Sequence, residues 1–249
     1  MYLLYSLALS TVFLLLSPYF LYQALKNGKY APGFLQRLGI YSSDGLPTSS
    51  TKPIWVHAVS VGEFLTALPL IRALKHELPG RQLVVTTTTL SGQRLARDRL
   101  TDEQSVSAIL YFPFDWTFTV NRALNRVDPA AVIILETELW PNFFRRCHTR
   151  NVPVFLVNGR ISARSFKRYR LIRAFMARVL AHLSLALMQS ADDAERITAL
   201  GADPKSVRIC GNLKHDAVPL TSGTSSLEAH RPAHDRTGSP NLLPARSRD

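Results

Sequence analysis

The chain has 249 residues, of which 46% are hydrophobic and 19% charged, a globular composition that excludes a wholly disordered or low-complexity protein. Thirty Lys and Arg against 18 Asp and Glu give a formal net charge of +12, which favours anionic partners. The two cysteines, Cys147 and Cys210, have no metal-ligand spacing, so a disulfide framework is excluded and a reducing compartment is indicated.

The first predicted element is an apolar helix over residues 1–25, which contain no charged side chain. Some twenty apolar residues can cross a bilayer, and Pro18 is tolerated in such a helix. Lys26, Lys29 and Arg37 follow, so the positive-inside rule places the rest of the chain in the cytoplasm. A cleaved signal peptide is disfavoured because no positive charge precedes the apolar run. A spanning anchor is preferred, and a helix lying in one leaflet is the alternative.

Residues 41–52, rich in Ser, Gly, Pro and Thr, are predicted to be a linker. From 53 to 218, apolar strands alternate with amphipathic helices, which predicts a Rossmann-like α/β fold: a mostly parallel sheet with helices on both faces. The predicted strands are 54–58, 83–87, 106–111, 131–135, 154–157, 185–188 and 207–210. The predicted helices are 63–78, 91–100, 118–127, 139–150, 166–183 and 191–200. Residues 219–249 lack apolar periodicity and are predicted to be disordered.

The most informative motif, HAVSVGE at 57–63, connects the first of these strands to its helix. A strand that runs through Ser60 and Gly62 into a helix forms the edge where open α/β sheets bind ligands. Glu63 falls in the first helical turn, where the helix dipole lets a carboxylate stay ionised and accept a proton. The alternative is that Glu63 only caps the helix. His57, inside the strand, is predicted to be a hydrogen-bonded core residue.

Two further carboxylates, Glu136 and Glu138, follow the fourth predicted strand. Buried carboxylates are costly unless something pairs or uses them, and neighbouring acids can share protons. The alternative is a salt bridge to a nearby Arg beside a helix N-terminus. Pro141 is predicted to start the next helix, because proline is tolerated in the first turn.

Polar residues also follow other strands. Thr88 ends a Thr-rich strand, where hydroxyls and amides can hold an anion. Asn158 suits a tight turn, and Arg160 is predicted to project into the cleft. Lys214, after the last strand, can neutralise a phosphate or a developing negative charge. No nucleotide-phosphate loop is indicated, and the seven histidines lack metal-ligand spacing, so no metal is predicted.

The positive charge is concentrated, because no acidic residue lies between Glu138 and Asp192 while ten basic residues do. Lys167 and Arg168 belong to this run and lie on the helix predicted at 166–183, whose other side is apolar. Such a run forms either a solvated face or a surface for anions. No nucleic-acid-binding module is visible, and the apolar N-terminus favours lipid as the anionic partner.

Taken in order, these segments resemble the 3-deoxy-D-manno-octulosonic acid (Kdo) transferases of Gram-negative lipopolysaccharide synthesis. The resemblance covers residues 1 to about 218, and the matching motifs are 55–63, 86–92, 113–115, 136–142, 157–162, 189–190 and 211–214. The chain departs from the family at Gly159, where Ala is more frequent. It also lacks the family's second, nucleotide-sugar-binding domain, so a truncated form is predicted.

The resemblance implies the N-terminal, acceptor-binding half of a B-type glycosyltransferase that moves Kdo from CMP-Kdo to lipid IVA, without metal or cofactor. It implies a location on the cytoplasmic side of the bacterial inner membrane. Glu63 would be the general base, and Glu136 or Glu138 with Lys214 would steady transition-state charge. The residues expected to bind substrate are Ser60, Gly62, Thr88, Asn158, Arg160, Lys167 and Arg168. The alternative is a non-catalytic, membrane-anchored module that binds anionic lipid and no nucleic acid.

Overall fold

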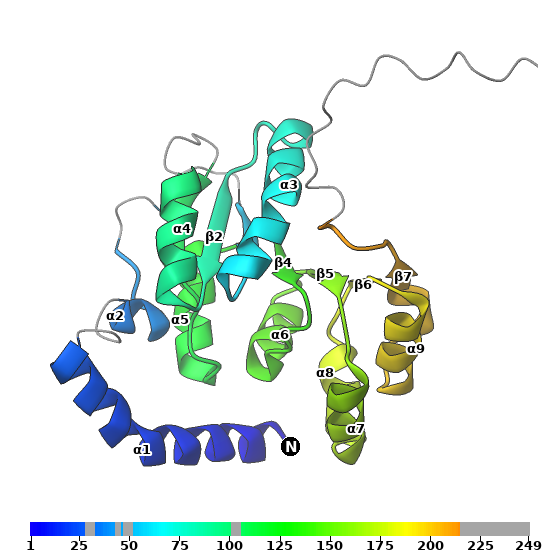
Figure 1. Ribbon diagram of the computed structural model, residues 1–249, viewed down its shortest axis with the longest axis horizontal. Helices are drawn as coiled ribbons and strands as arrows, with labels where there is room; N and C mark the ends of the chain where they lie inside the picture. The colour runs from blue at the N-terminus through cyan, green and yellow to red at the C-terminus, as the bar shows by residue number, and fades with distance from the viewer. Residues whose placement is uncertain (28–32, 43–45, 47–51, 101–105, 215–249) are drawn as a thin grey trace, which may run out of the picture. The chain divides into compact units, whose positions relative to one another are not determined.

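The computed structural model describes residues 1–27, 33–42, 46, 52–100 and 106–214 (Figure 1). Seven strands form one parallel sheet in the order β3-β2-β1-β4-β5-β6-β7. The strands are β1 Ile54–His57, β2 Leu83–Thr87, β3 Val106–Tyr111, β4 Ala131–Leu135, β5 Val154–Gly159, β6 Leu185–Met188 and β7 Val207–Ile209. The predicted Rossmann-like sheet is confirmed. The predicted tail, 219–249, lies outside the described residues.

Helices connect the strands. They are α1 Tyr2–Asn27, α2 Phe34–Arg37, α3 Val61–Glu77, α4 Leu90–Leu100, α5 Thr117–Val127, α6 Pro141–Thr149, α7 Ala163–Leu171, α8 Arg173–Leu180 and α9 Ala191–Ala199, with a 3₁₀ turn at Pro204–Ser206. The prediction that Pro141 opens a helix is confirmed. The single helix predicted at 166–183 is wrong, because the chain leaves helical geometry at Ile172 (φ −118°, ψ 29°). That stretch holds no Gly or Pro, so nothing local in the sequence marks the break.

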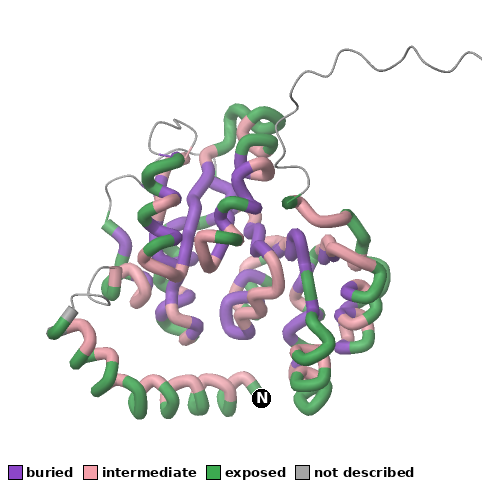
Figure 2. Tube along the Cα trace, in the orientation of Figure 1, coloured by how far each residue is buried: buried purple, intermediate pink, exposed green. Residues whose placement is uncertain are grey.

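The sheet has one hydrophobic core on each face (Figure 2). Successive side chains of a strand point to opposite faces, so Trp55 enters one core and Val56 the other. Helices α3 and α4 cover the Val56 face, and α5, α6, α8 and α9 supply buried side chains to the Trp55 face. The rings of Trp55 and Phe143 meet edge to face at 5.2 Å, joining β1 to α6. Because side chains pack on both faces of the sheet, the strands and their carboxyl ends are held in position.

The N-terminal apolar helix is confirmed as α1, of 26 residues with Pro18 inside it. Its stretch Tyr2–Ala24 has a mean hydropathy of 1.7 and no buried residue, and is long and apolar enough to cross a membrane. Of the predicted linker, 43–45 and 47–51 lie outside the described residues. Tyr41 is buried and its hydroxyl donates to the Tyr111 carbonyl at 3.1 Å.

Candidate functional site

The start of α3 holds the Glu63 carboxylate in a capping box. Ser60 is the N-cap residue, and its hydroxyl donates to Glu63 Oε1 at 3.1 Å. The Val59 N–H donates to Glu63 Oε2 at 2.8 Å. The capping contact foreseen for Glu63 is therefore present, and it turns the carboxylate back over the end of β1. A carboxylate has about four acceptor sites, so these two bonds leave room for a substrate hydroxyl.

Burial raises the pKa of Glu63 above its ordinary value of 4.5. The Val59 N–H opposes this shift, the negative charge of Glu136 adds to it, and the positive charge of Lys214 opposes it. These influences come from the ends of β4 and β7, so three separate segments converge on one carboxylate. A carboxylate with a raised pKa is a stronger base near neutral pH.

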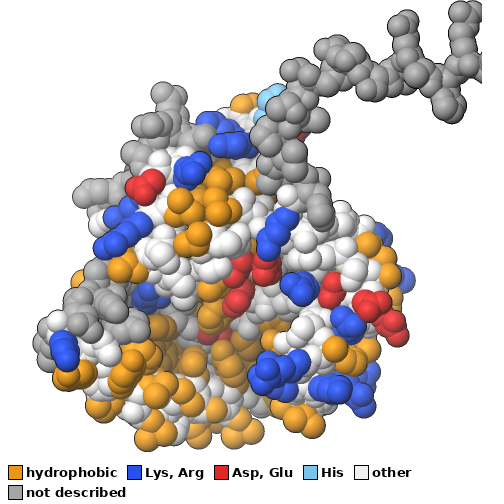
Figure 3. All heavy atoms as spheres, in the orientation of Figure 1, with side chains coloured by type: hydrophobic (Ala, Val, Ile, Leu, Met, Phe, Trp, Pro, Cys, Tyr) orange, Lys and Arg blue, Asp and Glu red, His pale blue; other side chains and the backbone are white. Residues whose placement is uncertain are grey.

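Glu138 belongs to the same acidic cluster. Burial, followed by the charges of Glu63 and Glu136, raises the pKa of Glu138 to about 7. Near neutral pH Glu138 is therefore partly protonated. Within the described ranges none of the three glutamates forms an ion pair, so the salt-bridge alternative for Glu136 and Glu138 has no support. In Figure 3 acidic side chains gather near the centre of the face shown, with basic side chains beside them.

Left-handed backbone angles also occur at the carboxyl ends of the strands. Glu136 and Asn158 follow or end the adjacent strands β4 and β5, and both adopt left-handed backbone angles, with φ of 55° and 59°. Such an angle is uncommon for glutamate, whereas asparagine adopts it more readily. The fully buried Asn158 accepts the Leu213 N–H at 3.1 Å through Oδ1. Asn158 thereby holds the segment that carries the exposed Lys214 beside the acidic cluster.

Buried polar atoms without a hydrogen-bond partner also lie at the carboxyl ends of the strands. Among the described residues, five buried side-chain atoms lack a hydrogen-bond partner. Four of them lie at the carboxyl ends of the adjacent strands β2, β1, β4 and β5: Thr88 Oγ1, His57 Nε2, Trp140 Nε1 and Asn158 Nδ2. The fifth, Gln82 Oε1, lies at the other end of β2. Because buried polar groups almost always find a partner, this edge is the place where a ligand or water is expected.

The prediction that His57 is a hydrogen-bonded core residue is confirmed. Its ring is fully buried, stacks on Phe112 at 3.8 Å, and places Nδ1 3.0 Å from the Thr86 hydroxyl. Burial lowers the pKa of His57 to about 3, so the ring is neutral at physiological pH. A neutral ring in this position supports the sheet edge and does not supply a positive charge.

Thr88 is held through its backbone. The Arg37 guanidinium donates to the Thr88 carbonyl at 2.6 Å and lies 4.4 Å from the centroid of the Tyr111 ring. Arg37 was expected only as a flanking charge of the membrane anchor. The structure instead packs it against the domain, next to a residue predicted to bind substrate.

The remaining predicted substrate residues, Arg160, Lys167 and Arg168, are exposed. Arg160 is exposed, and its N–H donates to Thr137 Oγ1 at 2.8 Å, which ties the loops after β4 and β5 together. Lys167 and Arg168 are exposed on α7. Their neighbour Tyr169 packs against the core on the Trp55 face, and burial and then the charge of Glu138 raise its pKa.

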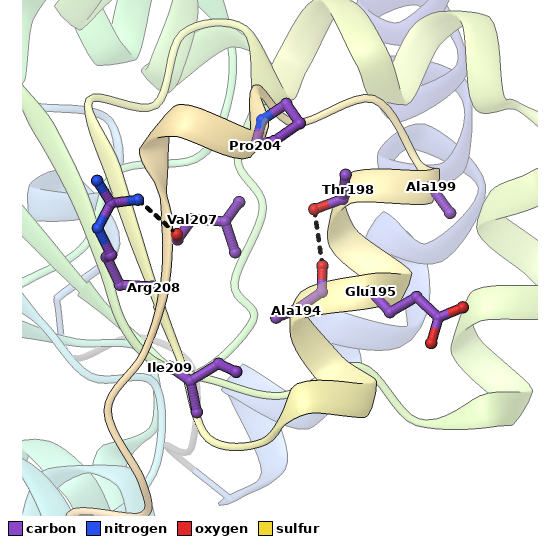
Figure 4. Close-up of a pocket in the computed structure, with 8 residues that line it drawn as sticks. All are labelled: Ala194, Glu195, Thr198, Ala199, Pro204, Val207, Arg208 and Ile209. Atoms are coloured by element: carbon purple, nitrogen blue, oxygen red, sulfur yellow. Dashed lines mark hydrogen bonds between the residues drawn. The ribbon is translucent and has the colours of Figure 1, made fainter.

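A pocket elsewhere in the fold contains none of these residues. It lies between α9 and β7 and is lined by Ala194, Glu195, Thr198, Ala199, Pro204, Val207, Arg208 and Ile209 (Figure 4). Val207 and Ile209 point toward α9, whereas Arg208 points away from it (Figure 4). Within the described residues, no group of three His, Cys, Asp or Glu side chains could hold a metal ion.

Comparison with known proteins gives consistent matches. The sequence model of the family described as 3-deoxy-D-manno-octulosonic-acid transferase (kdotransferase) matches residues 33–217. The 3-deoxy-D-manno-octulosonic acid transferase of Haemophilus influenzae is 35% identical over 193 residues, covering 78% of this chain and 44% of that protein. The Bordetella pertussis protein of the same name is 32% identical, covering 76% of this chain and 43% of that protein. The chain thus spans less than half the length of these relatives.

Solved structures with the same fold include Staphylococcus aureus MnaA with UDP, at a TM-score of 0.51 and 16% identity, covering 67% of this chain and 47% of that one. A UDP-N-acetylglucosamine 2-epimerase matches at a TM-score of 0.50 and 13% identity, covering 72% of this chain and 53% of that one. At such identities the likeness concerns the fold alone. The family match covers most of the chain and includes the capping box, the acidic cluster and the Lys214 segment. The chain therefore belongs to the 3-deoxy-D-manno-octulosonic-acid transferase family.

Proposed function

We propose that this chain provides the acceptor-binding half of a Kdo transferase that moves Kdo from CMP-Kdo to lipid IVA. The proposal rests on the position of the Glu63 carboxylate. Hydrogen bonds from Val59 and Ser60 hold it at the start of α3, and its oxygens can still accept a further hydrogen bond. The pKa of Glu63 lies above its ordinary value and is shifted by the charges of Glu136 and Lys214. Such a carboxylate is suited to take a proton from a hydroxyl.

In the proposed reaction, Glu63 takes the proton from the primary hydroxyl of lipid IVA as that oxygen attacks the anomeric carbon of Kdo. The bond from Kdo to the CMP phosphate breaks, its electron pair leaves with CMP, and the anomeric configuration inverts. Lys214 faces the leaving phosphate, and Glu136 or Glu138 steadies positive charge that develops on the sugar. Ser60, Asn158 and the strained backbone at Glu136 keep these groups in position.

The test is transfer of labelled Kdo from CMP-Kdo to lipid IVA in vesicles. The chain is assayed as it stands and as a fusion of residues 1–217 to the unmatched part of the Haemophilus influenzae relative. Transfer by the fusion that depends on Glu63 supports the proposal. A fusion that folds, binds CMP-Kdo and transfers nothing to lipid IVA overturns it.

A second candidate is the non-catalytic anionic-lipid module. It is favoured by the exposed leucines of α1 together with the acid-free basic run, because apolar area and nearby Lys or Arg both strengthen binding to anionic membranes. Vesicle binding by the chain without any Glu63-dependent transfer in the fusion identifies this candidate.

Gly62 offers a test of where the acceptor lies. It is exposed in the first turn of α3, and a Cβ added there would meet no atom within 4 Å. Gly62→Ala should stabilise the fold by roughly 0.5–1 kcal/mol through helix propensity. It should also raise the KM for lipid IVA several-fold, because the methyl group occupies the space over the helix start. Thermal unfolding and steady-state kinetics of the fusion measure the two effects.

Gly80 provides the matched control. It is also exposed, and a Cβ there would likewise meet nothing within 4 Å, but it lies in the turn before β2. Gly80→Ala should leave the KM unchanged. Equal KM values for both variants and the wild type would place the acceptor away from the start of α3.

A further inference from the structure

The N-terminal half of α1 is docked on the domain along its length. Tyr2 packs on Phe175 of α8 at 5.5 Å between ring centroids and its hydroxyl lies 2.9 Å from His182 Nε2. Eleven residues later, Phe13 packs on Trp116 at 4.9 Å. At 1.5 Å per residue these contacts are about 16 Å apart along the helix. Both ends of this stretch therefore touch the same domain.

Hydroxyl groups hold the helix between these two contacts. The Ser6 hydroxyl accepts a hydrogen bond from Asn142 Nδ2 at 3.0 Å. The Ser10 hydroxyl accepts one from the Trp116 indole at 3.0 Å, and Tyr5 lies beside the buried carboxyl group of Asp115. We call Ser6 and Ser10 the hydroxyl stripe. These two residues are four positions apart, so they lie on one face of the helix.

The opposite face of α1 is apolar and exposed. Among its side chains are Leu3, Leu4, Leu7, Leu14 and Leu15, exposed by 83, 67, 63, 68 and 75%. In Figure 2 the outer side of α1 is exposed while the side toward the domain is partly covered. Figure 3 shows hydrophobic side chains along this lower margin of the molecule. A continuous, exposed leucine surface of this kind indicates a site that binds an apolar partner.

Charge around the helix identifies that partner. The α1 sequence contains one charged residue, Lys26, at its end. Arg145 lies over the Tyr2 ring at 4.8 Å, at the other end of the helix. The α7–α8 pair, whose Phe175 contacts Tyr2 and Tyr5, carries basic residues and no acidic one: Arg164, Lys167, Arg168, Arg170, Arg173 and Arg178. Leucines bordered by unopposed cations are complementary to the surface of an anionic bilayer.

We propose that α1 lies in the plane of one leaflet of an anionic phospholipid membrane, held flat against the domain by the hydroxyl stripe. A helix that crosses the bilayer can touch a domain in water only near one end, whereas α1 touches this domain at Tyr2 and at Phe13. The docking residues Asp115 and Asn142 follow β3 and β4, and Asn142 is four residues after Glu138. The arrangement thus brings the leaflet beside the acidic cluster.

The test measures membrane depth by spin labels on the full chain in vesicles of phosphatidylcholine and phosphatidylglycerol. Single cysteines replace Leu3 or Leu14 in a Cys210→Ser background, with the buried Cys147 retained and the background alone as the labelling blank. In-plane binding predicts that the two labels lie at equal depth to within about one helical turn, 5.4 Å. A spanning helix predicts a difference of about 16 Å, and that result overturns the proposal. Labels that both stay in water also overturn it.

A second pair of variants tests the hydroxyl stripe. Ser6→Ala with Ser10→Ala removes the acceptors for Asn142 and Trp116 and should increase the depth difference between the two labels. Ser17→Ala is the matched control, because the Ser17 hydroxyl donates to the Leu14 carbonyl of its own helix at 2.8 Å. The control should keep the two depths equal. An unchanged depth difference in the double variant shows that the stripe does not hold the helix, and contradicts the proposal.

Discussion

Glu63→Gln should lower kcat for Kdo transfer by a factor of about 100 to 10,000, the range that general acid–base catalysis contributes. Glutamine keeps an oxygen that can accept the Val59 N–H, so the capping box survives in part and the fold should lose no more than about 1 kcal/mol. What the variant cannot do is take a proton from the acceptor hydroxyl. Single-turnover transfer by the fusion, beside thermal unfolding, separates the chemical effect from the structural one.

The control for this variant is Glu77→Gln, at the exposed far end of the same helix. Its only described contact is with the neighbouring His76, so transfer should stay at the wild-type rate. A Glu63→Gln enzyme with wild-type kcat would show that Glu63 acts only as a helix cap.

The pH dependence of transfer follows from the same carboxylate. A base must be ionised, so the rate should rise with pH through the pKa of Glu63, which lies above 4.5. Glu136→Gln removes a negative neighbour, lowers that pKa and moves the rise to lower pH. Lys214→Met removes a positive neighbour, raises the pKa and moves the rise to higher pH. Rates at saturating substrate between pH 4 and 9 measure these opposite shifts, and shifts in the same direction would contradict the assignment.

Sequence patterns predicted the sheet well because each strand is a short apolar run between helices, and burial on both faces leaves such runs little freedom. Glu63 could also be placed, since Ser60 three residues earlier is a local cap signal. Local patterns could not predict the docking of α1. Ser6 and Ser10 look unremarkable in a leucine-rich helix, and their partners Asn142 and Trp116 lie more than 100 residues away. The nearness of Tyr169 to Glu138 could not be predicted for a related reason, because Glu138 comes from another loop.

Asp115 shows how such a long-range contact determines stability. Its carboxylate oxygens accept the Asn142 N–H at 2.9 Å and the Phe143 N–H at 2.8 Å, so it caps α6 from the loop after β3. The N-cap position of α6 is occupied by Trp140, whose side chain supplies no capping bond. Asp115 therefore satisfies two helix-end donors that are buried and that nothing nearby in the sequence can reach.

Asp115→Asn should destabilise the fold by about 1–3 kcal/mol, because the amide NH₂ group cannot accept the second N–H, whereas a carboxyl oxygen can accept it whether it is ionised or protonated. Burial raises the pKa of Asp115 to about 7, above its ordinary 3.8. Between these pH values the folded chain binds a proton that the unfolded chain releases, so this group's contribution to stability falls as pH rises and is lost above about 7. The advantage of wild type over Asp115→Asn should therefore be largest near pH 4 and smallest above pH 7.

Denaturant unfolding of the full chain in detergent at pH 5 and pH 8 measures that difference. The control is Asp128→Asn, whose carboxylate pairs with Lys52 at 3.0 Å while both side chains are more than half exposed. An exposed pair of this kind contributes at most about 1 kcal/mol, and asparagine tolerates the left-handed backbone of that residue. If the wild-type advantage instead grows with pH, Asp115 is ionised in the fold. In that case the two α6 N–H groups stabilise the carboxylate by more than its desolvation costs, and Asp115 caps α6 in its ionised form.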